Sequence, residues 1–143
     1  MKCSFKLRKL YFMKPTIFLF GESEKGEFGT PFFCKSLSHI LNALGNPPNE
    51  SLGIYYAIQA ILYKQDLIFF RVKEEGFSSK DYIEGLGHIK KHLLEPRAQA
   101  IFIPGVGDKK IIEATVDVCN LGHSLLVLTE KDLYDYLTSS NLN

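Results

Sequence analysis

The sequence predicts a three-layer α/β/α sandwich around a short, mainly parallel sheet of about four strands. Three observations support this prediction: a length of 143 residues, which fits one domain, four short apolar runs, and helical patterns between those runs. Apolar runs without polar alternation are typical of strands that helices cover on both faces. The four runs lie at residues 16–20, 67–70, 100–103 and 124–128.

Helical patterns fill the segments between these runs and follow the last one. They cover residues 31–44, 51–63, 79–94, 109–121 and a last short stretch that ends near 137. Thr30 is the expected N-cap of the first helix, and Pro31 occupies its first position. Gly122 suits the end of the fourth helix, and Thr129 with Asp132 resembles a capping box at the start of the last one.

Strands that alternate with helices pair in parallel through right-handed crossover connections. The sequence leaves the strand order open, but this alternation is that of a Rossmann-like or flavodoxin-like domain. Because no repeat or linker interrupts the pattern, residues 1–143 are expected to form one domain. Residues 1–14 are expected to form a basic arm or an edge strand, and residues 138–143 a frayed tail.

The first 14 residues carry five basic residues and no acidic residue. Apolar and polar residues alternate over positions 3–8, which is typical of a half-exposed strand. Such a strand could lie at a sheet edge, where its lysines would oppose pairing with other chains. In an alternative interpretation, Met13 is the biological start and residues 1–12 are upstream sequence. A signal peptide is not expected, because Lys14 and Pro15 interrupt the apolar stretch.

Composition and charge disfavour several classes of function. Five of the 17 basic residues lie in the arm, so the rest of the chain holds 12 basic and 16 acidic residues. The net negative charge of this part of the chain disfavours nucleic acid as the main partner. No apolar run approaches the ~20 residues that a membrane span requires. Three cysteines without C-x-x-C spacing predict neither a disulfide framework nor a zinc site, so we expect a cytoplasmic protein without a bound metal.

If the protein binds a small molecule, the site is expected beyond the carboxyl ends of the parallel strands. The first loop there, residues 21–30, has Gly21 and Gly26 at the spacing that opens a phosphate-binding P-loop. A P-loop then requires Lys and Ser or Thr, whereas Glu27 and Phe28 follow here. The three glutamates of this loop would also repel phosphate, so no P-loop is predicted.

Glu22, directly after the first strand, is the candidate for chemistry. Its carboxylate would accept hydrogen bonds from ribose hydroxyls, or act as nucleophile or general base at a sugar. The alternative is a solvated loop acid. A ligand pocket is expected to unite Gly21, Glu22 and Ser23 with residues of the later loops. These later residues are Gly105, Gly107, Asp108 and Thr129.

The loop after the third strand offers a candidate anion site. Gly105 and Gly107 would let a ligand approach the backbone, and the N-terminus of the next helix follows at once. Lys109 or Lys110 would supply positive charge. Asp108, however, is well placed as the N-cap of that helix, and its carboxylate would then occupy the free N–H groups. Capping is therefore the favoured interpretation of Asp108.

Pairs of cysteine and histidine offer no further site. Cys34 lies in the first turn of a predicted helix, where the dipole lowers a thiol pKa. His39, however, projects about 140° away from it on the same helix, so packing is the expected role of Cys34, as it is of Cys119. His88 and His92 have the i, i+4 spacing of metal ligands. No H-E-x-x-H signature accompanies them, and they are expected on a solvated face.

The predicted helix at 51–63 has almost no polar face beyond Gln59. A helix that is covered on one side only should show such a face. This helix is therefore either buried within the domain or packed against another chain. Tyr55, Tyr56 and Tyr63 lie on it, and tyrosine is enriched at protein interfaces. We expect a homo-oligomer, most simply a symmetric homodimer, through this surface.

Three functions remain open. The first is a binding or regulatory module for a nucleotide, nucleoside or other small polar metabolite at the carboxyl edge of the sheet. The second is an oligomeric protein-interaction domain that works through the helix at 51–63. The third is an enzyme that acts on a sugar or nucleoside bond through Glu22. The sequence identifies no cofactor and no particular ligand.

Overall fold

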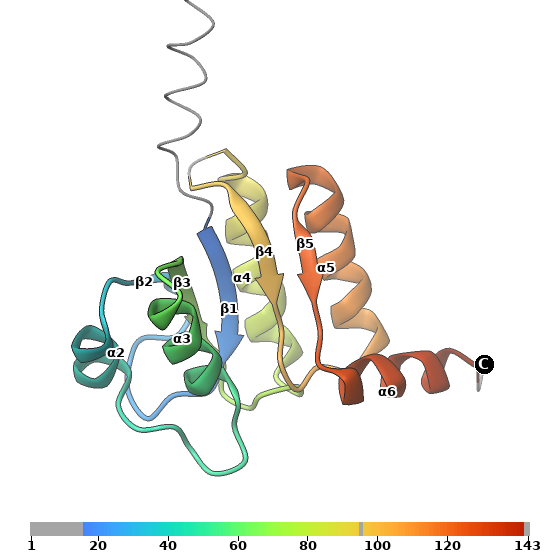
Figure 1. Cartoon of the computed structure of the whole chain (residues 1–143). Coiled ribbons are helices and arrows are strands. Elements are labelled where there is room, and N and C mark those ends of the chain that lie inside the picture. Colours follow the sequence, from blue (N-terminus) through green and yellow to red (C-terminus); the bar gives the residue numbers. More distant parts are fainter. Residues whose placement is uncertain (1–15, 95, 142–143) are drawn as a thin grey trace, which may run out of the picture.

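The structure is a computed structural model that describes residues 16–94 and 96–141 (Figure 1). These residues form five helices and a five-stranded sheet. The predicted α/β sandwich with a mainly parallel sheet is therefore confirmed. The predicted basic arm, residues 1–14, and the end of the predicted tail, residues 142–143, lie outside the described residues.

The sheet has the strand order β2-β3-β1-β4-β5. Its strands are β1 (Thr16–Gly21), β2 (Phe32–Cys34), β3 (Asp66–Arg71), β4 (Ala98–Phe102) and β5 (Leu125–Val127). β1 lies in the middle and pairs in parallel with both β3 and β4, while β5 pairs in parallel with β4. β2 is antiparallel to β3. The parallel strands therefore end at one edge, where their arrows point in Figure 1.

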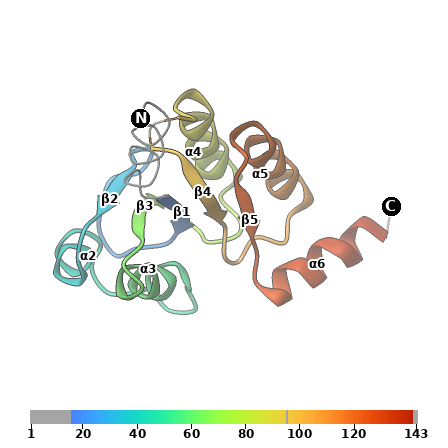
Figure 2. The same cartoon turned by 45° about the horizontal axis from the view of Figure 1, so that its top comes forward.

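Helices cover the two faces of the sheet. They are α2 (Leu37–Leu44), α3 (Gly53–Leu62), α4 (Ser79–Lys91), α5 (Lys109–Gly122) and α6 (Glu130–Asn141). α2 and α3 lie on one face and α4 and α5 on the other, as the turned view shows (Figure 2). α6 follows the last strand and projects from the end of the sheet. None of the helices that the described residues form is long and apolar enough to span a membrane.

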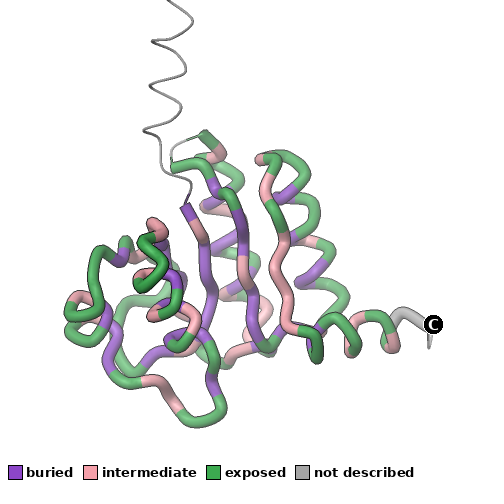
Figure 3. The backbone as a smooth tube through the Cα atoms, in the orientation of Figure 1, coloured by how far each residue is buried: buried purple, intermediate pink, exposed green. Residues whose placement is uncertain are grey.

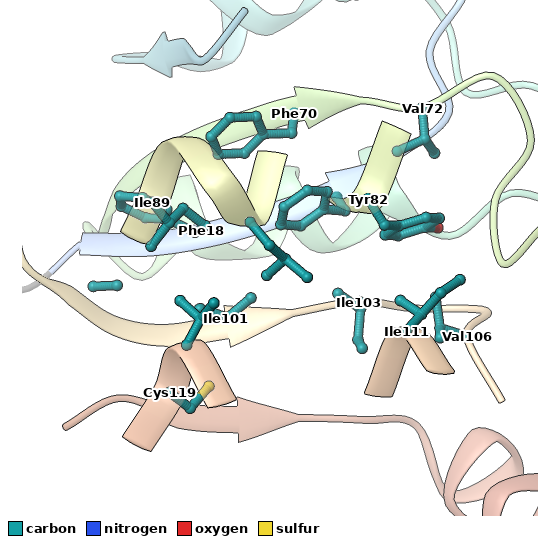
Figure 4. Packing of buried hydrophobic residues seen from close by; sticks show 14 of the residues in the cluster. Phe18, Phe70, Val72, Tyr82, Ile89, Ile101, Ile103, Val106, Ile111 and Cys119 are labelled. Carbon is teal, nitrogen blue, oxygen red and sulfur yellow. The ribbon is translucent and has the colours of Figure 1, made fainter. Parts of the chain in front are cut away.

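Each face of the sheet has its own core of buried side chains. Successive residues of a strand point to opposite faces. Phe18 and Phe20 of β1 therefore lie in the core beside α4 and α5, while Leu19 lies in the core beside α3. In the first core the Phe20 ring stacks on Phe70 and Tyr82, with centroids 4.8 and 5.4 Å away. Figure 4 shows this core between α4, α5 and the sheet.

The predicted helix at 31–44 is wrong in its first part. Its first residues form β2, and α2 begins later, with Ser36 as its N-cap. Thr30 is therefore not the N-cap. Pairing explains the difference, because β2 covers the outer edge of β3 and buries Cys34 in the core beside α3. This tertiary contact outweighs the local helical signal.

Other predicted boundaries shift by a few residues. α6 continues to Asn141, past the predicted end near 137, so part of the predicted frayed tail is helical. The left-handed residue after α5 is His123, with a φ of 53°, whereas Gly122 still belongs to the helix. β5 is not covered on both faces as its apolar run predicts, because Leu125 is exposed.

Candidate functional site

The carboxyl edge of the sheet brings four loops together. These loops follow β1, β3, β4 and β5, and they span residues 22–31, 72–78, 103–108 and 128–129. From β1 the chain passes to β3 on one side and then returns past β1 to β4 on the other. This reversal lies between β1 and β4, and such a reversal is the place where ligands bind in open parallel sheets.

Glu22 is half-buried and bonds to the loop after β3. Its Oε2 accepts a hydrogen bond of 3.1 Å from the backbone amide of Glu75. Both carboxylate oxygens of Glu75 in turn accept from the amide of Leu52, at the start of α3, at 3.1 and 3.2 Å. Two glutamates from separate loops therefore meet beyond the end of the central strand.

Burial raises the pKa of Glu75 to about 7. Partial removal of water is the largest cause, because it penalises the charged form. Backbone hydrogen bonds at Leu52, Glu22 and Gly53 lower this pKa, and the negative charge of Glu22 raises it. Glu75 therefore keeps its proton in a large part of the molecules near neutral pH, where an ordinary glutamate is charged.

α3 approaches β1 very closely at this edge. A Cβ at Gly21 would lie 2.7 Å from the Cα of Gly53, and a Cβ at Gly53 would lie 2.8 Å from the Cα of Gly21. Neither position has room for a side chain. The contact brings the first amides of α3 to Glu75, whose carboxylate caps the helix at Leu52, where no N-cap side chain does so.

The loop after β3 crosses from β3 to the loop after β4. Gly76 has a φ of 90° and lies so close to the carbonyl group of Gly105 that a Cβ there would overlap it. The amide of Gly76 also donates a 2.8 Å hydrogen bond to the hydroxyl group of Tyr82. Burial raises the pKa of this tyrosine. The loop after β3 therefore contacts the loop after β4 at the edge where a ligand is expected.

Gly105 and Thr129, two of the predicted ligand-binding residues, are joined through Asp132. The amide of Gly105 donates a 2.8 Å hydrogen bond to Oδ2 of Asp132, which is buried. The amide of Asp132 donates a 3.1 Å hydrogen bond to Oγ1 of Thr129. Thr129 thus caps α6 as predicted, but the carboxylate of Asp132 binds the loop after β4 instead of completing a capping box.

The remaining predicted residues bond or pack within the protein. Ser23 is buried and donates a 2.6 Å hydrogen bond to a carbonyl group of its own loop. Gly107 packs against Asp135 of α6, whose Cβ would be 2.8 Å from a Cβ at Gly107. Asp108 is the N-cap of α5, as favoured from the sequence, and accepts a 2.7 Å hydrogen bond from the amide of Lys110. The predicted residues therefore gather at one edge without lining a common open pocket.

Two cavities beside the sheet do not include Glu22 or Glu75. One of about 220 Å³ lies between the loop after β1, β2 and α2, and Glu27 and Arg71 line it. Arg71 donates to a backbone carbonyl group of that loop and stacks on Phe28, 4.2 Å from the ring centroid. The other, of about 410 Å³, lies beside α3 over β1, β3, β4 and β5.

The cysteines and histidines form no site of their own. Cys34 belongs to β2 rather than to a helix, and burial raises its thiol pKa to about 12. Cys119 is buried in α5 as expected, with its pKa raised to about 11. His88 is not on a purely solvated face, because its ring packs 5.9 Å from that of Phe70 and burial lowers its pKa. Within residues 16–94 and 96–141, no three side chains are placed to share a metal ion.

No family model, curated protein or solved structure matches this chain. A fold of this class supports many unrelated functions, so the function has to be inferred from the chemistry of the site. Glu22 can be identified from its place after a strand. Glu75 is not among the residues predicted from the sequence. Its position beside Gly76, in a loop at the same edge of the sheet, is the signal that points to it.

Proposed function

We propose that this protein binds a small polar metabolite with neighbouring hydroxyl groups, such as a nucleoside or a sugar, at the carboxyl edge of its sheet. This proposal rests on the hydrogen bond that brings the side chain of Glu22 to Glu75. Carboxylates accept hydrogen bonds from hydroxyl groups, and a protonated carboxyl group also donates one. Glu75, with a pKa of about 7, can do either near neutral pH.

A phosphate group fits this edge less well. The loops after β1 and β3 contain five glutamates, at Glu22, Glu24, Glu27, Glu74 and Glu75. The amides of Leu52 and Gly105, which a phosphate could use, already donate to Glu75 and Asp132. A phosphate would have to displace these carboxylates and approach the others. We therefore favour a nucleoside or sugar over a nucleotide.

Binding requires the loop after β3 to move, because Gly76 lies against Gly105. Both glycines have a positive φ, in a region that glycine enters and leaves at little cost. In the bound state we expect a hydroxyl group of the ligand to replace the amide of Glu75 as the donor to Glu22.

Thermal unfolding of the whole chain with a panel of nucleosides, sugars and matching nucleotides tests this proposal. A ligand at about 100 times its Kd adds ~2.7 kcal/mol to the free energy of unfolding, which raises Tm by several degrees. We expect a nucleoside or sugar to raise Tm more than its phosphorylated form does. Glu22→Gln and Glu75→Gln should each reduce this shift. Glu74→Gln, a change at the exposed neighbouring residue, should leave it intact.

Three outcomes would contradict the proposal. A shift by nucleotides alone would indicate an anion site away from the glutamate pair. A shift that survives both Glu22→Gln and Glu75→Gln would show that the ligand binds elsewhere. If no compound of the panel changes Tm, small-molecule binding is rejected and a protein-interaction domain becomes the better interpretation.

An enzyme that acts on a sugar or nucleoside bond is the second candidate, favoured by the raised pKa of Glu75. The protonated carboxyl group would give its proton to the leaving group, and Glu22 would act as nucleophile or take the proton of an attacking water. Chromatography of the nucleoside panel after incubation with the protein detects the released base. Glu22→Gln should abolish release without lowering Tm. Release that persists in this variant excludes the catalytic role of Glu22.

The cytoplasm is the proposed location of the protein. Cys34 and Cys119 are buried free thiols. Free thiols persist in a reducing compartment, whereas disulfides are common among exported proteins. Fractionation of cells that produce the chain tests this proposal, and its recovery from an exported fraction would contradict it.

A further inference from the structure

Among the described residues, no helix covers β4 and β5 on one face of the sheet. The strand register places Ala100 beside Leu125 and Phe102 beside Val127, so these side chains share one face, which we call the β4–β5 face. α3 lies on the same side of the sheet and reaches β4 through Tyr56, whose ring centroid is 4.4 Å from that of Phe102. Beyond α3, Figure 1 shows β4 and β5 with no described helix in front of them.

The β4–β5 face is apolar and hollowed. Ala100, Phe102 and Leu125 line the cavity of about 410 Å³ together with side chains of α3, β1 and β3. Leu125 is 67% exposed, and the other two residues of β5 are half-buried (Figure 3). Helices normally cover parallel sheets on both faces. Leu125, the first residue of this edge strand, therefore lacks such a cover in the described part of the chain.

α6 presents an apolar surface that is largely exposed in the described part of the chain. The helix follows β5 directly and projects past the end of the sheet (Figures 1 and 2). Leu133, Tyr134 and Leu137 are 45%, 66% and 51% exposed. Because successive residues of a helix turn by about 100°, these three side chains fall within about 100° of the helix circumference. They form one apolar stripe.

The first turns of α6 hold it on the opposite side of the sheet from the β4–β5 face. Asp132 accepts the hydrogen bond of Gly105, and Asp135 contacts Gly107. Tyr136 packs on the core beside α4 and α5. While these contacts persist, α6 cannot turn back onto the β4–β5 face of its own chain, which lies on the α3 side.

We propose that α6 of a second copy of this chain covers the β4–β5 face, and that two copies exchange these helices in a symmetric dimer. A two-fold axis repeats the contact, so the exchange covers both exposed surfaces of each chain. The two surfaces also match in character. Two of the three acids of α6, Asp132 and Asp135, contact the loop after β4 of their own chain, so the exposed stripe of this helix is apolar, as is Leu125 on the face.

This surface differs from the one that the sequence indicates. The apolar character of the predicted helix at 51–63 is explained largely by contacts within the domain, because several residues of α3 are buried there. These residues are Ile54, Ala57 and Ala60. Tyr63, at the other end, lines the cavity beside the β4–β5 face. The side of α3 that lines this cavity, with Tyr56, Gln59 and Tyr63, would border the α6 of the second copy.

Sedimentation velocity of the full chain between about 1 and about 100 µM tests the proposal. We expect the wild-type chain to dimerise in this range. Leu125→Lys on the face and Leu137→Lys on α6 should each raise the dimer Kd at least about tenfold, because each places a charge in both contacts. Leu121→Lys on α5 is the matched control, with 52% exposure, and should leave the Kd unchanged. Circular dichroism verifies that each variant is folded.

A mixture of the two variants distinguishes helix exchange from other dimers. The Leu125→Lys chain keeps its α6 and the Leu137→Lys chain keeps its face, so the mixture retains one intact contact and should dimerise better than either variant alone. A helix-to-helix dimer would respond only to Leu137→Lys, and a face-to-face dimer only to Leu125→Lys. Either result overturns the proposal. A wild-type chain that stays monomeric at the highest concentration also overturns it, and would indicate that another segment or partner covers the face.

Discussion

Glu22 Oε2 accepts a 3.1 Å hydrogen bond from the backbone amide of Glu75, which lies 53 residues later in the sequence. The contact brings two acidic side chains to the end of the central strand. Backbone amides hold them there, and the ion pair found among the described residues, between Lys109 and Glu113, involves neither. Protonation of Glu75 relieves the repulsion between the two carboxylates.

Glu75→Gln should change the pH dependence of stability. The pKa of Glu75 is raised from 4.5 to about 7, so the folded chain binds this proton more tightly than the unfolded chain does. The stability that the proton contributes is complete below about pH 4.5 and is lost as the pH rises through about 7. Glutamine has no such proton to lose. As the pH rises from about 5 to about 8, the free energy of unfolding of the variant should therefore increase relative to that of wild type. The increase should be about 2 kcal/mol or less, because the carboxyl group is partly exposed and solvent weakens its interactions.

Urea unfolding at both pH values measures this difference. Glu74→Gln serves as the control, because Glu74 is the exposed neighbour of Glu75 and its replacement should leave the pH dependence as it is in wild type. If Glu75→Gln shows the same pH dependence as wild type, the environment of Glu75 does not favour its protonated form.

Two glycines of α4 should respond to alanine in opposite ways. A Cβ at Gly85 would overlap the ring of Phe20, which is fully buried and stacked on two other rings, whereas a Cβ at Gly87 would meet nothing within 4 Å. We expect Gly85→Ala to lower the free energy of unfolding by about 1–2 kcal/mol. Gly87→Ala should raise it by about 0.5–1 kcal/mol, because alanine favours the helix. Equal effects in urea unfolding would contradict the close packing of α4 on Phe20.

Local patterns are sufficient for most of the fold, because each central strand is a short apolar run. Phe18 and Leu19 point to different cores, so both faces of β1 are apolar and the run is unbroken. β2 cannot be predicted in this way. Phe32 and Phe33 resemble the start of a helix after Pro31, and only their pairing with the distant β3 makes them a strand.

The candidate site is only partly predictable from the sequence. A rule about strand ends identifies Glu22 and the loops of the edge, but it does not say which of Glu74 and Glu75 turns toward α3. The spacing of Thr129 and Asp132 predicts a local cap, but the carboxylate of Asp132 binds a loop that precedes it by 27 residues. Such contacts depend on how loops from different strands are arranged in space. The spacing of residues along the sequence carries no information about this arrangement.

Asp132→Ala should loosen the attachment of α6 to the edge of the sheet. The substitution removes the acceptor of the Gly105 amide, and a hydrogen bond to a charged group contributes about 1.5–3 kcal/mol. Asp132→Asn keeps an acceptor oxygen and should lose less stability in urea unfolding. Hydrogen exchange at Gly105 should be faster in Asp132→Ala than in Asp132→Asn. Equal exchange rates would show that the carboxylate does not hold this loop.

Ser36→Ala and Thr30→Ala distinguish the observed start of α2 from the one expected from the sequence. Ser36 Oγ accepts a 3.1 Å hydrogen bond from the amide of His39, and the loss of an N-cap costs about 1 kcal/mol. Ser36→Ala should therefore lower Tm by a few degrees. Thr30 is exposed and precedes β2, so Thr30→Ala should change Tm little. The opposite ranking in thermal unfolding would mean that the helix starts near Pro31 and that β2 does not form.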